Sequence, residues 1–160
     1  MHAFTRPARA AAGFVIQGVG LLRYERWITR GMLQAEPGAL FVFGDNLRGA
    51  GRAPGAGQAA EMRGEPNAVG IPTKRAPSMA PSAFLSDADL PEFKAVAGAA
   101  FERLAGHLRA GGAVVWPAEG IGTGRAELAM RAPRIWAALE RARERLEGIG
   151  SDERAGTVGG

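Results

Sequence analysis

The chain has 160 residues, of which 46% are hydrophobic and 22% are charged, a composition typical of one folded globular domain. It has no cysteine, which excludes disulfides, thiolate zinc sites and a cysteine nucleophile, and its 2 histidines argue against a multi-histidine metal site. The net charge of +4 suits an anionic small molecule and is only weak support for nucleic-acid binding.

The two ends of the chain differ in composition from its middle. Residues 1–20 are rich in arginine and alanine and have only a short apolar stretch, so we predict a loose N-terminal extension of a cytoplasmic protein. Residues 148–160 combine glycine with charge and have no apolar period, which predicts a disordered tail. The folded domain is therefore expected at residues 21–147. No apolar run approaches the roughly 20 residues that span a bilayer, so we expect no membrane partner.

Short apolar runs alternate with helical patterns along this domain. Strands are predicted at residues 21–28, 39–43, 68–72 and 113–116, and helices at residues 55–63, 90–109 and 126–146. A proline-rich connection at residues 77–91 is expected to be irregular. Alternation of strands with helices predicts an α/β fold with a mostly parallel sheet and helices on its faces.

Polar or glycine-rich segments follow three of the predicted strands. Because ligands bind at the carboxyl ends of the strands in such sheets, these segments are expected to line one site. The first contains Gly44, Asp45, Asn46, Gly55, Gly57 and Gln58, the second Thr73 and Lys74, and the third Glu119, Gly120, Ile121, Gly122, Thr123, Gly124 and Arg125.

The glycines in the first and third segments favour phosphate binding. Glycine lets backbone N–H groups approach a phosphate closely, and the helix after each loop adds its positive end. Two such loops on neighbouring strands would suit the two phosphates of a pyrophosphate. Neither loop has the Walker A spacing, and the third segment reads G-x-G-x-G rather than the Rossmann fingerprint.

Each polar candidate has a functional and a structural interpretation. Asp45 suits a general base or a ribose contact, and Asn46 suits orientation of a ribose or a water, yet both residue types are also common in turns. Glu119 suits acid/base chemistry or an ion pair with an arginine. Lys74 suits a phosphate contact or simple exposure. Gln58 lies on the helix after the first loop, and we predict that it contacts the ligand.

The order of these segments resembles that of macrodomains, the ADP-ribose-binding modules. Residues 120–125, preceded by VVWPAE, resemble the second phosphate loop of that family. Residues 27–32 and 39–46 are similar to its opening turn and to its strand ending in N-A-A-N, with Asn46 at the last asparagine. Residues 41–46 and 55–59 are also similar to small phage-associated macrodomain-like proteins. The resemblance covers about residues 28–139 and implies a three-layer α/β/α fold.

The resemblance implies binding of ADP-ribose or a related NAD-derived nucleotide. Backbone amides of residues 55–58 and 120–124 would hold its phosphates. A hydrolytic member would cleave an ADP-ribosyl bond with an oriented water, using Asp45, Asn46 and Glu119, whereas a non-catalytic member would read or sequester a nucleotide signal. Met32 stands where the family has an aspartate for the adenine amine, which leaves the nucleobase open. We expect no metal, no cofactor and no nucleic-acid partner, and the oligomeric state stays open.

Overall fold

The fold is built on one parallel sheet. The computed structural model describes residues 20–49 and 57–158. Its four strands are β1 (Leu21–Glu25), β2 (Leu40–Asn46), β3 (Ala68–Lys74) and β4 (Ala113–Pro117), in the order β1-β4-β2-β3. Every pair of neighbouring strands is parallel. The carboxyl ends of all four strands therefore meet at one edge of the sheet.

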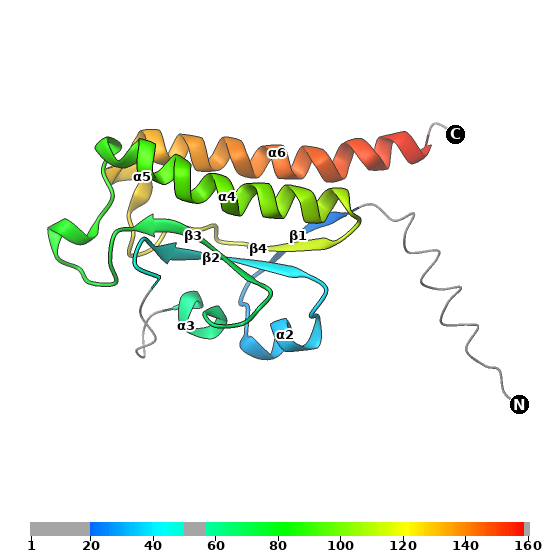
Figure 1. The fold of residues 1–160 in the computed structure, drawn as a ribbon, viewed down its shortest axis with the longest axis horizontal. Coiled ribbons are helices and arrows are strands. Elements are labelled where there is room, and N and C mark those ends of the chain that lie inside the picture. Colours follow the sequence, from blue (N-terminus) through cyan, green and yellow to red (C-terminus); the bar gives the residue numbers. More distant parts are fainter. Residues whose placement is uncertain (1–19, 50–56, 159–160) are drawn as a thin grey trace, which may run out of the picture.

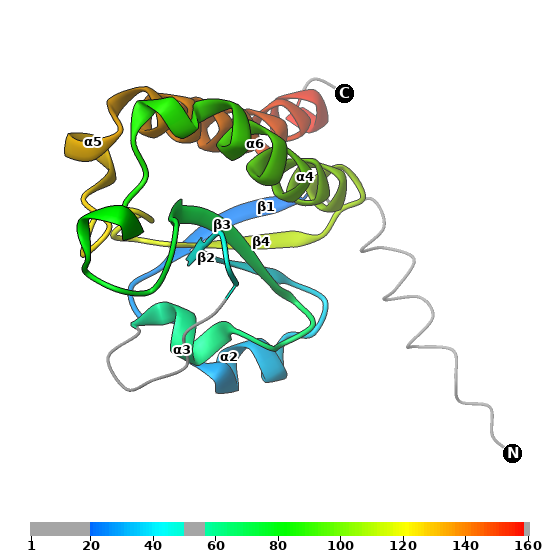
Figure 2. The ribbon, with the colours of Figure 1, turned by 60° about the vertical axis from the view of Figure 1, so that its left-hand side comes forward.

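Helices cover both faces of the sheet (Figure 1). The short helices α2 (Arg30–Ala35) and α3 (Gln58–Met62) lie on one face, and α4 (Leu90–Arg109) and α6 (Pro133–Val158) lie side by side on the other (Figure 2). The chain steps in one direction from β1 to β2 to β3 and then back to β4. Right-handed crossovers consequently place α4 opposite α2 and α3. The predicted three-layer α/β arrangement with a parallel sheet is confirmed.

Successive side chains of each central strand point to opposite faces of the sheet and so pack in two separate hydrophobic cores. Val42 of β2 packs in the larger core under α4 and α6, whereas its neighbours Phe41 and Phe43 pack in the smaller core against α2 and α3. On β4, Trp116 belongs to the larger core and Val115 to the smaller one. Burial on both faces explains why these strands appear in the sequence as continuous apolar runs.

Several element boundaries differ from those predicted. Helix α2 was not predicted, because its six residues are too few to show a period; Thr29 caps it in a capping box with Met32. The helix predicted at residues 126–146 is divided into α5 (Leu128–Arg131) and α6, because Pro133 cannot continue a helix and begins a new one. The connection at residues 77–91 holds two 3-10 turns, Pro81–Ala83 and Asp87–Asp89, and α4 begins at Leu90.

The predictions for the two ends have different outcomes. The extension predicted at residues 1–20 lies outside the described residues except for Gly20, which is buried against Leu108 of α4. The disordered tail predicted from residue 148 is wrong for residues 148–158, because α6 continues to Val158. Ile149 lies one turn beyond Leu146 and packs against the same core, so the apolar period extends past Gly148. No helix in the described part of the chain is long and apolar enough to cross a membrane.

Side-chain contacts of Asp89 hold the irregular connection between β3 and α4. Its carboxylate accepts a hydrogen bond from Ser86 N at 2.9 Å and pairs with Arg75. Burial by itself raises the pKa of Asp89, but the hydrogen bonds from Ser86 and Arg75 outweigh it and bring the pKa below its usual value. The ionised carboxylate therefore stabilises this segment.

We expect Asp89→Ala to lower the free energy of unfolding by about 1 kcal/mol at pH 7. Because the folded-state pKa is depressed, this contribution is present above the ordinary pKa of aspartate and is lost as the pH falls through the folded-state value. The difference between variant and parent should therefore shrink in acid. Urea unfolding across this pH range measures it, with the exposed Glu102→Gln as control. A difference that stays constant with pH would contradict the role of the ionised carboxylate.

Candidate functional site

A cavity of about 420 Å³ lies at the carboxyl ends of the strands. The chain after β2 leads to α3 on one face, whereas the chain after β4 leads to α5 and α6 on the other, so the two loops diverge. This is the point in an open α/β sheet at which ligands bind. The volume falls within the range of roughly 300–1,000 Å³ that is usual for small-molecule sites.

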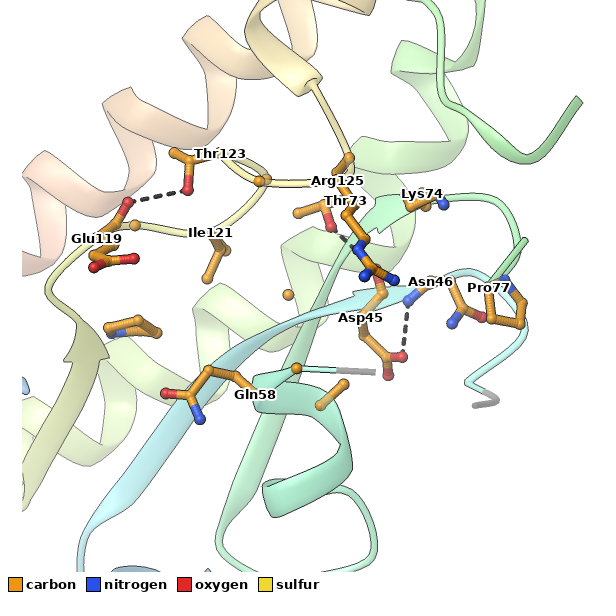
Figure 3. A pocket seen from close by; sticks show the side chains of 18 of the residues that line it. Asp45, Asn46, Gln58, Thr73, Lys74, Pro77, Glu119, Ile121, Thr123 and Arg125 are labelled. Carbon is orange, nitrogen blue, oxygen red and sulfur yellow. Dashed lines mark hydrogen bonds between the residues drawn. The ribbon is translucent and has the colours of Figure 1, made fainter. Parts of the chain in front are cut away.

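The structure brings the predicted site residues together at this cavity. They come from segments up to about 80 residues apart, and Figure 3 shows how the labelled lining residues are arranged. Gly55 lies outside the described residues. The predicted residues that line the wall are Gly44, Asp45, Asn46, Gly57, Gln58, Thr73, Lys74, Glu119, Gly120, Ile121, Gly122, Thr123 and Gly124.

The loop after β4 is folded tightly over the end of the sheet. Gly120 and Gly122 have φ angles of 84° and 76°, which favour glycine, and the carbonyl of Gly122 accepts a hydrogen bond from Leu128 N at 3.0 Å. Thr123 Oγ1 donates to the Glu119 carbonyl at 3.0 Å. A Cβ atom at Gly122 would stand 3.0 Å from the Leu128 side chain, so a substitution there would disturb the fold together with the site.

The carboxylate of Asp45 forms an ion pair with Arg63. One carboxylate oxygen lies 2.6 Å from Arg63 Nη1, and the same oxygen accepts a hydrogen bond from Asn46 N at 2.7 Å. Both side chains are mostly buried, and a Cβ at Gly70 would collide with Asp45, so the glycine makes room for this carboxylate. Arg63 also lies over the ring of Phe43. These contacts favour a structural role for Asp45 over that of a general base.

The side chain of Gln58 is likewise hydrogen-bonded within the protein, to the backbone of Ile28. Its amide oxygen accepts from Ile28 N at 2.9 Å, and its amide nitrogen donates to the Ile28 carbonyl at 2.6 Å. Glu61, one turn later, accepts from Arg30 N at 3.0 Å. The side chain of Gln58, a residue that we predicted to contact the ligand, thus anchors the segment after β1 onto α3. That anchoring fixes where Trp27 stands at the cavity rim.

Lys74 is a buried cation at the β3 side of the cavity. Only 9% of the residue is exposed, and its ammonium group donates to the Ser78 carbonyl at 2.5 Å and lies over the Phe84 ring. Within residues 20–49 and 57–150, no carboxylate lies within 4.0 Å of the ammonium group. Burial, and then the charges of Arg125 and Arg131, lower the pKa of Lys74. An anion entering the cavity would relieve this unfavourable charge.

The remaining two candidates occupy opposite parts of the wall. Asn46 Oδ1 accepts from Arg48 N at 3.0 Å, which shapes the turn after β2, and its side chain faces Pro77 (Figure 3). Glu119 is exposed, and it forms no ion pair with any arginine of the described chain. The structural interpretation of Glu119 as an arginine partner is therefore not supported.

Four lining residues with reactive or bulky side chains were missed: Arg26, Trp27, Arg63 and Met79. Trp27 is 57% exposed at the rim, an unusual position for so large an apolar group. Trp27 was missed because the strand was predicted to extend over residues 21–28. In the structure β1 ends at Glu25, and residues 26–27 belong to the loop that follows it. An earlier end to that strand would have placed Trp27 among the strand-end residues.

The chain belongs to DUF7831, a family of unknown function whose model matches residues 23–142. The match includes every residue that lines the cavity. No curated protein and no solved structure gives a significant match to the chain.

We expect Asp45→Asn to lower the free energy of unfolding by about 2 kcal/mol, because it removes the negative charge that neutralises the mostly buried Arg63. The double variant Asp45→Asn/Arg63→Met should lose less than the sum of the two single variants. Chemical denaturation of the four proteins measures this coupling. Additive losses, or an Asp45→Asn variant as stable as the parent, would show that the ion pair contributes little and that the carboxylate is free for chemistry.

Proposed function

We propose that this member of DUF7831 binds ADP-ribose or a related NAD-derived nucleotide in the cavity at the carboxyl ends of its strands. The observation that carries the proposal is Lys74, an ammonium group buried beside the cavity without a carboxylate partner among the described residues. Burying such a charge is costly, and a bound anion would compensate for the cost. The resemblance to macrodomains, read from the order of the loops, supplies the nucleotide class.

The dimensions and chemistry of the wall support a ligand of this class. Residues after all four strands line the cavity. With strands about 4.8 Å apart, the wall extends about 14 Å from β1 to β3, which suits an elongated nucleotide. Phosphates would lie between the backbone of residues 120–124 and the cations Lys74 and Arg125. Trp27, at the β1 end, would offer an aromatic face to a planar base.

If the protein is an enzyme, Glu119 is the carboxylate best suited to activate a water. Asp45 is neutralised by Arg63, whereas Glu119 has no such partner in the described chain. The water would attack the anomeric carbon of the distal ribose as the bond to the leaving group breaks, and Glu119 would accept its proton. The alternative is a binder that sequesters a cytoplasmic nucleotide without turnover. The exposed position of Glu119 favours this alternative, because surrounding water weakens the electrostatic influence of the carboxylate on a ligand.

The first test is calorimetric titration of the protein with ADP-ribose, NAD and AMP. We expect ADP-ribose to bind and Lys74→Met to weaken it at least about tenfold, through loss of a charge-assisted contact to phosphate. The melting temperature of Lys74→Met should equal or exceed that of the parent, because the folded-state pKa of Lys74 is lowered and its charge opposes folding at pH 7.

The chain offers a matched control for this experiment, since Lys74 and Lys94 are its only lysines. Lys94 is exposed on α4, and Lys94→Met should leave the affinity unchanged. Equal weakening by both variants would indicate a non-specific charge effect. Absence of binding by all three ligands would overturn the proposal of an NAD-derived nucleotide.

Glu119→Gln separates the enzyme from the binder. If the protein hydrolyses an ADP-ribosyl bond, this isosteric change should reduce turnover of an ADP-ribosylated peptide by at least about a hundredfold while ADP-ribose affinity changes little. Release of free ADP-ribose, followed by chromatography, provides the measurement. If the parent protein binds ADP-ribose but releases none, the non-catalytic alternative is correct.

A further inference from the structure

We infer that the groove between α4 and α6 is a docking site for an acidic amphipathic helix of a protein partner. The groove has a volume of about 530 Å³ and lies in the helical layer, and none of the described residues that line it also lines the cavity at the strand ends. It forms because the two helices, which lie side by side in Figure 1, meet through small side chains. Those that line it include Ala97, Gly98, Ala105, Ala138 and Ala142.

Larger apolar side chains complete the floor of the groove. Phe93 and Leu146 belong to the buried core, and Phe101 and Ile149 are partly buried against it. An apolar floor between two helices is the surface that accepts a helix through side chains at positions i, i+3 or i+4, and i+7. From Phe93 to Arg109 the groove follows about 24 Å of α4, enough for a partner helix of about 16 residues.

Charge at the rim decides which kind of helix fits. The rim carries Lys94, Arg109, Arg141 and Arg145 against one acidic residue, Glu102. All five are exposed, and none forms an ion pair with another side chain of the described ranges. Arg143, by contrast, is not among the lining residues and pairs with Glu140 and Glu147. Four unpaired cations around an apolar floor favour a partner with carboxylates flanking its apolar stripe.

The same charges argue against the other occupants. A second copy of the chain docked through this face would bring like charges together. Residues 1–19 contain Arg6 and Arg9 and no acidic residue, so that segment does not complement the rim. Nucleic acid would meet the cations but would leave the apolar floor unmatched, whereas an acidic amphipathic helix satisfies both.

Fluorescence anisotropy with a labelled synthetic peptide tests the inference. The probe is an 18-residue helical peptide with leucine at helical spacing and glutamate on both flanks, and a matched peptide carries lysine in place of glutamate. We expect the acidic peptide to bind the full-length protein and the lysine peptide not to bind. Backbone amide chemical shifts should change along α4 and α6.

Two variants of the groove and one control variant test whether the peptide binds in the groove. Arg145→Glu reverses a rim charge, and Gly98→Glu places a charged side chain in the groove at a position where an added Cβ meets no atom within 4 Å, so both should fold. Each should weaken peptide binding at least about fivefold. Arg48→Glu makes the same charge reversal at an exposed site outside the groove and should have no effect.

Four results would overturn the inference. They are absence of binding of the acidic peptide, equal binding of the lysine peptide, loss of binding in Arg48→Glu to the same extent, and shift changes outside α4 and α6. Tighter binding of a 20-nucleotide oligothymidine that depends on Arg145 would instead identify a nucleic-acid face. A concentration-dependent dimer abolished by Arg145→Glu would identify a second copy as the occupant.

Discussion

Right-handed crossovers in a parallel sheet place α3 and α4 on opposite faces, and the loops that follow β2 and β4 diverge as a consequence. The cavity is the space between these loops. Because β4 lies between β1 and β2, a residue after β1 and a residue after β3 both reach its wall. The position of the site is therefore set by strand order before any particular side chain is considered.

Charge is distributed unevenly along the cavity wall. Near β3, Lys74 is buried, and Arg125 and Arg131 lower its pKa further. The carboxylate of Asp45 is neutralised by Arg63, and Glu119 lies exposed on the loop after β4. Most buried charges in proteins are paired, so Lys74 is the exception on this wall. A ligand with a negative group at the β3 end fits this distribution better than a neutral one.

Several polar side chains of the segments that follow the strands bond to the protein itself rather than face a ligand. Gln58 makes both of its amide hydrogen bonds to Ile28, Glu61 accepts from Arg30 N, and Asp89 joins the start of α4 to Arg75. These contacts hold the loops in which the candidate ligand-binding groups lie. The segments that follow the strands thus combine residues that position the site with residues that line it.

The sequence alone predicted the elements whose signal is local. The apolar face of residues 90–109 predicted α4 with both ends correct, and the apolar runs located all four strands, because burial on one or two faces imposes a regular pattern on neighbouring residues. It also placed glycine-rich and polar segments at strand ends, and since parallel strands share one edge, their convergence followed.

The role of each polar residue in those segments depends on contacts that form only on folding. Asp45 is paired with Arg63, which follows α3, Gln58 is bonded to the backbone of Ile28, and Lys74 lies against Phe84. The continuation of α6 beyond Gly148 likewise depends on packing of Ile149 against the core. Which side chains form ion pairs or become buried depends on contacts between residues that are distant in the chain. A local sequence pattern does not predict such contacts.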